Sequence, residues 1–469
     1  MTFTYNHQKQ GLWMLILFSC ISCMSCKKLV NIPEPTTTIT TSETFSTDAT
    51  ATSALIAIYN NLVGGSLNFG NGGTTIYSGL SADELNYFYG PGSDQYQYQT
   101  NTLLSANNTV SSVFWTPAYF NIYQANAVIE GLQTSSGVSA ATKKQLTGEA
   151  KFLRAFCFFN LVNLFGDVPL VTTTAWAHTD MLSRAPVTQI YQQIIADLKD
   201  AQNTLPDDYS VSGGERIRVN KSGATALLAR VYLYQGKWES AEAQASLVIG
   251  NTGLYNLVGD LNTAFLKNSN EAILQWGVNN DVWPYATQEG FNIVPYDTTT
   301  NPNYYLTSQL LSAFEKGDQR RVKWVDSTDY LGTYYYFPFK YKVYTGTQGN
   351  ITEYFMVLRL AEQYLIRAEA EANGAPGDPI ADLNIIRHRA GLPNYTGGTG
   401  APLLAAIAQE RRIELFAESG HRWFDLKRTG KTDSVLARLK PQWQTTQKLY
   451  PIPKSELVVD PNLTQNPGY

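Results

Sequence analysis

The sequence predicts an all-α protein built from helical hairpins, with long irregular segments between them. Two observations carry this prediction: helix-forming stretches recur in pairs along the chain, and the apolar periodicity largely fails across an aromatic-rich insertion at residues 276–349. The insertion holds ten tyrosines between Tyr285 and Tyr344. Irregular segments on a rigid scaffold are where ligands usually bind. The chain has 469 residues, more than one core usually supports, which favours two lobes or a repeat architecture.

The first 25 residues resemble a lipoprotein signal peptide. A polar start with one lysine precedes an apolar run at residues 12–18 and then small residues, the pattern of a secretory leader. The run is too short to cross a membrane. Cys26, after Ser25, resembles the acylated cysteine of a bacterial lipobox. Cys20 also follows a serine, and an ordinary leader with incidental cysteines is a third interpretation. We favour Cys26 because a Thr- and Pro-rich tether, residues 26–43, begins there.

The same cysteines invite a metal interpretation. Cys20, Cys23 and Cys26 lie three residues apart. A ferredoxin-type run continues to a fourth cysteine followed by proline, and Lys27-Lys28 stand here instead. The spacing therefore does not predict an iron–sulfur cluster.

Four helices are expected before residue 215. Apolar periodicity marks residues 49–62, 112–132 and 186–204. Residues 149–170 are apolar almost all round, which predicts a helix that is buried on most sides and ends at Gly166. Arg154 interrupts this helix, and a buried charge needs a partner. We therefore expect an ion pair between Arg154 and an acid from another helix.

The second half of the chain contains the recurring pairs. Residues 221–250 predict a helix, a turn at residues 235–237 and a second helix, with alanines where the two must meet. This stretch resembles a tetratricopeptide hairpin of about 34 residues. Similar helices are expected at 357–392 and 403–419. We divide the mature chain into an N-terminal region, residues 44–215, and a C-terminal region, residues 216–469.

Composition and motifs exclude several function classes. The formal net charge is −4, and no basic patch stands out, so nucleic acid is not an expected partner. Outside the leader the only histidines are His178, His388 and His421, which leaves little for proton transfer or a metal site. Nucleophile-elbow, Walker and G-x-G-x-x-G motifs are missing from the sequence. We expect no metal and no cofactor.

Clustered acids suggest catalysis at first sight. Glu410, Glu414 and Glu418 lie four apart, and Glu418 begins an E-x-x-H, but a di-iron site needs a second such pair. Neutralisation of these acids by neighbouring arginines is the simpler interpretation. The expected partners are Arg411, Arg412 and Arg422.

Two adjacent acid pairs, residues 83–84 and 207–208, raise the hypothesis of a glycoside hydrolase. Sequence neighbours rarely flank a sugar bond with the separation of about 5–10 Å that hydrolysis needs. Solvated loops are the default interpretation of both pairs.

Aromatic loops supply the candidate ligand-binding residues. Flat rings can stack on the apolar C–H faces of sugars, while neighbouring amides and carboxylates bond the hydroxyl groups. Most single tyrosines of such a region pack against other side chains and bind no ligand. Trp324 is likewise expected to be structural. Gly, Pro and polar neighbours single out a set of candidates: Asp83, Asn86, Tyr87, Tyr89, Tyr96, Trp283, Tyr285 and Tyr296.

Several stretches together resemble the SusD/RagB family of surface nutrient-binding lipoproteins. The segment "CKKLVNIPEPTT" is similar to the acylated start of that family, and "KFLRAFCFFNLVNLFGDVPLV" to its first helical hairpin. The later repeat is represented by "YLIRAEAEA" and "LNIIRHRAGLP". "ERRIELFAESGHRWFDLKRTG" and "LYPIPKSELVVDPNLTQNPGY" resemble the C-terminal signatures. The resemblance covers essentially the whole mature chain.

The resemblance implies an α-helical fold on four tetratricopeptide-like hairpins, with irregular loops forming the ligand face. It implies a lipid anchor in the outer membrane, display on the cell surface, and a SusC-like TonB-dependent transporter as partner. It implies binding of oligosaccharides without cleavage, so no catalytic residue carries over. Lys27-Lys28 depart from the acidic residues that often follow the acylated cysteine in exported relatives. Three alternatives stay open: a peptide-binding member of the family, a glycoside hydrolase, and a tetratricopeptide adaptor that binds only proteins.

Overall fold

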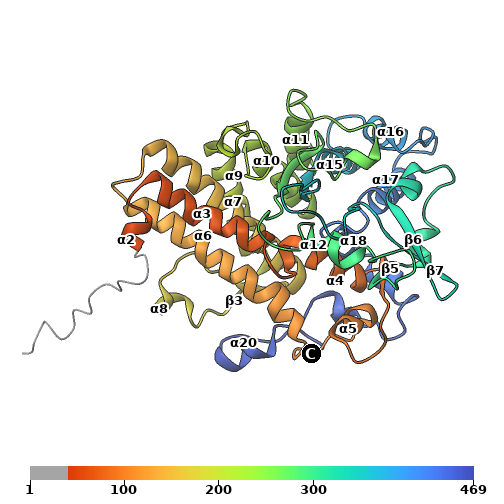
Figure 1. Cartoon of the computed structure of the whole chain (residues 1–469), viewed down its shortest axis with the longest axis horizontal. Coiled ribbons are helices and arrows are strands. Elements are labelled where there is room, and N and C mark those ends of the chain that lie inside the picture. Colours follow the sequence, from red (N-terminus) through yellow and green to blue (C-terminus); the bar gives the residue numbers. More distant parts are fainter. Residues whose placement is uncertain (1–40) are drawn as a thin grey trace, which may run out of the picture. The chain divides into compact units, whose positions relative to one another are not determined.

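Long helices dominate the computed structural model, which describes residues 41–469 (Figure 1). The predicted leader, Cys20 and Cys26 lie outside the described residues. Nine helices of eleven or more residues are described: α3 (Asp48–Val63), α6 (Thr116–Thr134), α7 (Ala140–Phe165), α9 (Val187–Thr204), α10 (Lys221–Tyr234), α11 (Trp238–Ile249), α15 (Leu360–Ala372), α16 (Pro379–Arg389) and α17 (Ala401–Glu414).

Shorter helices connect these elements. They are α2 (Thr41–Thr44), α4 (Thr74–Ser81), α5 (Asp94–Thr100), α8 (Trp176–Thr179), α12 (Gln288–Ile293), α13 (Ser308–Leu311), α14 (Gln319–Lys323), α18 (His421–Arg428), α19 (Thr432–Leu436) and α20 (Lys454–Val459). The structure also describes two π-helical segments, η2 (Phe69–Gly73) and η3 (Val110–Trp115). Three 3₁₀ turns are described as well: η4 (Ser210–Ser212), η5 (Leu261–Thr263) and η6 (Thr445–Lys448). Residues 41–43, predicted as the end of an extended tether, lie in the short helix α2.

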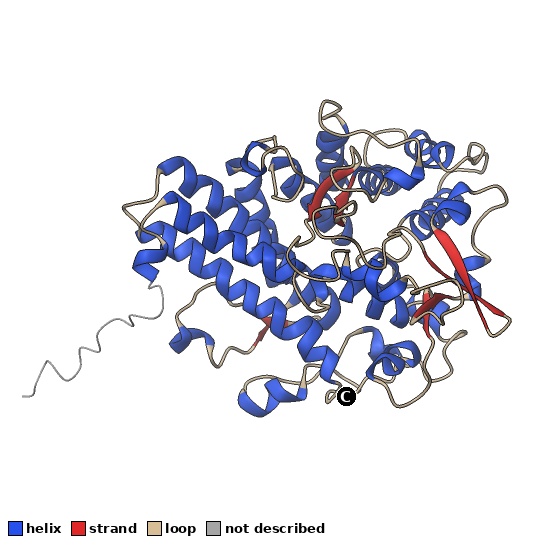
Figure 2. Ribbon diagram, in the orientation of Figure 1, coloured by secondary structure: helices blue, strands red, loops and turns tan. Residues whose placement is uncertain are grey.

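The described strands form four antiparallel pairs (Figure 2). The pairs are β1 (Leu85–Tyr87) with β5 (Tyr304–Leu306), β2 (Val168–Pro169) with β3 (Arg184–Ala185), β4 (Ala272–Trp276) with β8 (Phe355–Arg359), and β6 (Val325–Tyr330) with β7 (Thr333–Pro338). In the β1–β5 register Asn86 stands opposite Tyr305. Because β5, β6 and β7 belong to the insertion at 276–349, two of these pairs shape the region where helical periodicity fails.

The helices pack in chain order, α6 on α7, α7 on α9, α9 on α10, α10 on α11 and α11 on α15. The turn between α10 and α11 falls at residues 235–237, where the sequence predicts it, with Gly236 at φ +64°. Ala226, Ala229, Ala241 and Ala245 are fully buried, which lets the helix backbones approach closely. The predicted all-α scaffold of tetratricopeptide-like hairpins is confirmed.

One cluster of buried apolar side chains runs from Phe45 to Ile452. Residues on both sides of the division drawn at 215/216 therefore contribute to the same core. Helix α7 supplies much of it and ends at Gly166, whose φ of +76° is accessible to glycine. The helix begins at Ala140, nine residues before the apolar stretch, because its first two turns are polar. None of the helices in residues 41–469 is long and apolar enough to cross a membrane.

The predicted partner of Arg154 is Asp197 on α9. Its Nε and Nη2 atoms donate to the two Asp197 oxygens at 2.8 and 2.7 Å, and Nη1 donates to Asn126 at 2.7 Å. Both charged side chains are buried. The ion pair expected for a charge on an apolar helix is confirmed.

Two predicted helices need correction. Residues 357–359 belong to strand β8 rather than to a helix, because β8 pairs with β4 before α15 begins. Helix α17 ends at Glu414, so Glu418 does not share a helical face with Glu410. Leu415 caps the helix, and Ala417, at φ +47°, turns the chain away from a helical path before Glu418 is reached.

The three glutamates are neutralised, but by arginines far away in sequence. Arg320 Nη1 lies 2.6 Å from Glu410 and 2.9 Å from Glu414, and Arg359 lies 2.6 Å from Glu414 and 2.7 Å from Glu418. Burial alone would raise the pKa of Glu414, but Arg389, Arg359 and Arg320 hold the pKa well below its usual range. The predicted partners bind other acids: Arg411 pairs with Asp425, and Arg412 and Arg422 pair with Asp83.

Candidate functional site

A first cluster of exposed rings lies around α12. Trp283 and Tyr296 are 60% and 73% exposed. The Trp283 ring meets the edge of Phe291 at 4.8 Å, Phe291 stacks on Tyr344 at 5.3 Å, and Tyr296 meets Tyr344 at 5.8 Å. These four residues form the Trp283 cluster, in which each ring is held by a neighbour and two rings still face solvent.

A second cluster lies on the paired strands β1 and β5 and on the hairpin β6–β7. Tyr87 contacts Tyr89 at 5.4 Å and Tyr304 at 5.5 Å. Tyr89 is 47% exposed, and its hydroxyl accepts a hydrogen bond from Asn301 at 3.1 Å. The remaining members of this Tyr89 cluster are Phe88, Tyr305, Tyr330 and Tyr335.

The segment between α12 and β5 joins the two clusters. The Asn303 side chain donates to the Asn292 carbonyl of α12 at 3.3 Å, and α12 packs against β5. The Asp297 carboxylate caps the loop through the Thr299 amide at 2.8 Å. Together the two clusters form what we name the aromatic surface, with the amide side chains of Asn301 and Asn303 between them.

The structure brings together two pairs of the predicted residues: Tyr87 with Tyr89 in one ring cluster, and Trp283 with Tyr296, through Phe291 and Tyr344, in the other. Asn86 lies in β1 and is half-buried. Tyr96 is half-buried in α5, and Tyr285 is half-buried in a loop at φ +58°; neither belongs to a ring cluster. Trp324 is fully buried, as its structural role requires.

Asp83 does not reach the aromatic surface. It is 4% exposed, and its two oxygens bind Arg422 at 2.6 Å and Arg412 at 2.8 Å. Burial opposes ionisation of Asp83, but hydrogen bonds and charge from Arg422 keep its pKa below the usual value. The pair Asp83-Glu84 is therefore not a solvated loop, and we leave Asp83 out of the site.

Sequence reasoning missed several members of the aromatic surface, including Phe88, Phe291, Tyr335 and Tyr344. Alternation along β7 gives no signal for Tyr335 as a surface ring, because it places Tyr335 on the same face as the buried Phe337. Phe291 and Tyr344 carry no periodic signal either, because a loop brings them together.

The charge of the aromatic surface has one sign. Residues 86–110, 277–306, 325–339 and 343–352 supply all its rings and contain no Lys, Arg or His. Their acids are Asp94, Asp281, Glu289, Asp297, Asp326 and Asp329. Burial raises the pKa of Glu289 to about 8, so this side chain adds little charge at neutral pH.

Two cations that flank these segments contact other groups of the protein. Arg321 lies 4.7 Å from the Tyr336 ring, on the opposite face of β7 from Tyr335. Lys342 donates to the Lys323 carbonyl at 2.9 Å. The surface can therefore stack apolar ligand faces and bond hydroxyl groups, but the segments that carry its rings provide no cation for a carboxylate, sulfate or phosphate.

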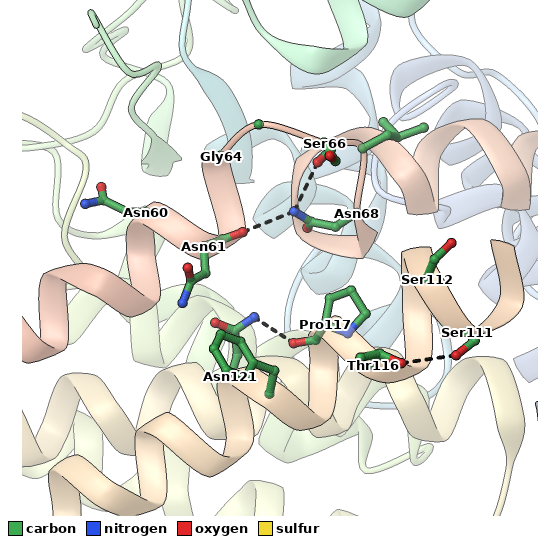
Figure 3. Close-up of a pocket in the computed structure, with 13 residues that line it drawn as sticks. Asn60, Asn61, Gly64, Ser66, Asn68, Ser111, Ser112, Thr116, Pro117 and Asn121 are labelled. Atoms are coloured by element: carbon green, nitrogen blue, oxygen red, sulfur yellow. Dashed lines mark hydrogen bonds between the residues drawn. The ribbon is translucent and has the colours of Figure 1, made fainter. Parts of the chain in front are cut away.

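A separate hollow of about 650 Å³ lies between the end of α3 and the start of α6 (Figure 3). None of its thirteen lining residues is charged, and eight carry a side-chain amide or hydroxyl group. They are Asn60, Asn61, Gly64, Gly65, Ser66, Leu67, Asn68, Ser111, Ser112, Thr116, Pro117, Phe120 and Asn121. We name this hollow the asparagine pocket. It shares no residue with the aromatic surface.

Metal chemistry finds no support in residues 41–469, where no group of three or more His, Cys, Asp or Glu side chains could hold an ion. His421 is buried, and burial lowers its pKa to about 4. Its Nε2 lies 3.9 Å from Glu362, and it does not face a ligand surface. The E-x-x-H at residues 418–421 thus belongs to the interior.

The fold defines the class of the protein: a helical-repeat scaffold that presents rings on irregular insertions. Two family models match the chain, one described as starch-binding and associating with the outer membrane at residues 76–233, and one described as the SusD family at residues 267–439. The chain belongs to the SusD family.

Known relatives agree with this assignment. A SusD-like protein, P2, of Formosa agariphila is 27% identical over 426 residues, covering 79% of this chain and 83% of the relative. The solved structure of a laminarin-binding SusD-like protein is 26% identical, with a TM-score of 0.76 over 91% of this chain and 100% of that one. A SusD superfamily protein from Bacteroides vulgatus is 24% identical, with a TM-score of 0.80 over 90% and 99% of the two chains.

Proposed function

We propose that this protein is a non-catalytic, lipid-anchored glycan-binding protein of the outer membrane. In this proposal it captures neutral oligosaccharides at the aromatic surface and hands them to a SusC-like TonB-dependent transporter. The observation that carries the proposal is the set of exposed rings Trp283, Tyr296 and Tyr89 on segments without a cationic side chain. The laminarin-binding relative supports the same ligand class, since laminarin is a neutral glucan.

The physical argument begins with the rings. An exposed aromatic ring that is held in place by a neighbour offers a flat apolar face at little further loss of side-chain entropy. Pyranose rings have apolar C–H faces that match such a platform, and the amides of Asn301 and Asn303 can exchange hydrogen bonds with sugar hydroxyl groups. Anionic glycans are disfavoured because Asp281 and Asp297 are exposed and the segment that carries them, residues 277–306, holds no Lys, Arg or His.

A glycan array tests the proposal with neutral glucans, mannans and xylans beside alginate, polygalacturonate and carrageenan. We expect retention on one or more neutral polysaccharides and none on the anionic ones. Substituting Trp283→Ala should weaken that retention. Trp176→Ala is the matched control, because Trp176 is 74% exposed on α8 and lies outside the aromatic surface. Equal loss in both variants would contradict the assignment of the surface.

The alternative functions predict different results in three further assays. A glycoside hydrolase would release new reducing ends from a bound glycan, and a peptide-binding member would bind a peptide library and no glycan. An adaptor would copurify with a protein other than a transporter. The lipid anchor is tested by labelling with a radioactive fatty acid, which Cys26→Ser should abolish and Cys20→Ser should not.

A further inference from the structure

The asparagine pocket is built like a ligand site, although neither the predicted residues nor the aromatic surface includes it. Its volume of about 650 Å³ falls within the range of about 300–1,000 Å³ typical of small-molecule sites. Figure 3 shows α3 and the loop after it on one side, with Asn60, Asn61, Gly64 and Ser66, and the start of α6 on the other. The pocket therefore has one wall from α3 and the loop after it, and a second wall from η3 and the start of α6.

The loop wall is fixed before any ligand arrives. The Asn68 side chain donates to the Asn61 carbonyl at 3.2 Å, and the Asn71 side chain donates to the Val63 and Ser66 carbonyls at 3.1 and 3.0 Å. The Asn71 Oδ1 in turn accepts a hydrogen bond from the Asn68 backbone N–H at 2.7 Å. Such bonds hold residues 64–68 in one conformation, which lowers the ordering penalty when a ligand binds.

Several polar groups in the pocket lack partners. Across residues 41–469 the side chains of Asn60 and Ser112 make no hydrogen bond, and both residues are exposed. Asn121 is 2% exposed; its Nδ2 donates to the Pro117 carbonyl at 2.7 Å, while its Oδ1 has no partner in the described chain. A buried acceptor left without a donor is destabilising, and a donor brought by a ligand or a water would relieve it.

Phe120 supplies the apolar platform. It is 52% exposed on α6, between a buried Asn121 and an exposed Thr116. Leu67 and Pro117 extend the apolar area on either side of the pocket. A large ring left in water beside amides and hydroxyl groups, in a pocket whose lining carries no charge, suits a ligand that has both an apolar face and many hydroxyl groups.

We propose that the asparagine pocket is a second carbohydrate site, which binds a short neutral saccharide against Phe120 with Asn60 and Ser112 bonding its hydroxyl groups. Asn61 can add only its Oδ1 as an acceptor, because its Nδ2 donates to Gln124 at 2.7 Å. This inference rests on the proposed function, because it assigns the same ligand class to a second place. Phosphorylated and carboxylated ligands are excluded by the lack of any cation in the lining. Two sites on one chain would hold a polysaccharide more firmly than either alone.

Titration calorimetry tests the inference on the soluble mature chain. The probes are laminarihexaose, cellohexaose, maltohexaose, mannohexaose and xylohexaose, and the hexasaccharide bound by the unmodified protein is used for all variants. We expect about two molecules per chain for the unmodified protein and about one for Phe120→Ala or for Trp283→Ala. The double variant should bind none. Asn60→Ala, which removes a side chain without partners, should weaken the same site as Phe120→Ala and guards against a folding defect in that variant.

Tyr123→Ala is the matched control for Phe120→Ala. Tyr123 is 53% exposed one turn further along α6 and does not line the pocket, so its loss should leave two sites. Binding of one molecule per chain that Trp283→Ala abolishes and Phe120→Ala leaves intact would overturn the pocket and keep the proposed function. Loss with Phe120→Ala alone would keep the pocket and overturn the aromatic surface. Failure of the unmodified protein to bind any hexasaccharide would overturn both.

Discussion

Replacing Trp283 with alanine gives the sharpest prediction for the aromatic surface. A tryptophan side chain presents about 250 Å² when free, and Trp283 is 60% exposed, which leaves about 150 Å² for contact. A sugar ring stacked on one of its two faces would cover about half of that area. At about 25 cal/mol per Å² the contact contributes about 2 kcal/mol, or about thirtyfold in Kd.

The assay is affinity electrophoresis in gels that contain a neutral polysaccharide, followed by calorimetry with its oligosaccharide. Trp283→Phe should keep part of the affinity, because a smaller ring still stacks. Trp176→Ala should leave the affinity unchanged. Unaltered binding by Trp283→Ala, with circular dichroism showing an intact fold, would refute the reasoning, since the exposed ring would then contribute nothing.

The remaining predictions concern ligand charge, the buried ion pairs and pH. Asp281→Lys should raise affinity for an anionic polysaccharide such as alginate on the glycan array, since it adds the missing cation; no gain would show that charge does not set selectivity. Glu414→Gln should lower the free energy of unfolding by about 3–5 kcal/mol in urea titrations, because it leaves buried arginines short of a partner. Glu315→Gln is its control, with an expected loss below about 1 kcal/mol, since Glu315 is 46% exposed where it meets Arg387 and solvent screens the pair. The pKa of His421 is lowered from 6.5 to about 4, chiefly by burial, so the unfolded chain takes up the proton first and stability is lost as pH falls from about 6.5 to about 4. Between pH 7 and pH 5 this loss should be about 2 kcal/mol greater than in His421→Gln, and equal losses would place His421 in contact with water.

The sequence alone was sufficient for most of the helical scaffold. Apolar periodicity is a local property, and it predicted the bounds of α3, α9 and the α10–α11 hairpin to within one residue. Gly166 ends α7 because its backbone conformation is one that glycine adopts easily. Arg154 pairs with an acid because a charge buried on an apolar helix needs a partner of opposite sign.

The tertiary structure alone decided which charges meet and which rings gather. The sequence predicts that Asp83 is a solvated loop carboxylate. In the structure Arg412 and Arg422, more than 300 positions away, donate hydrogen bonds to it. The sequence places Glu414 among three acids four residues apart. In the structure Arg320 and Arg359, from other segments, neutralise it. Phe291 and Tyr344 become neighbours only when their loop folds back. Spacing along the chain determines which residues lie on one helix face. Ion pairs, ring clusters and the asparagine pocket depend instead on contacts between distant segments. A single sequence carries no periodic signal for such contacts.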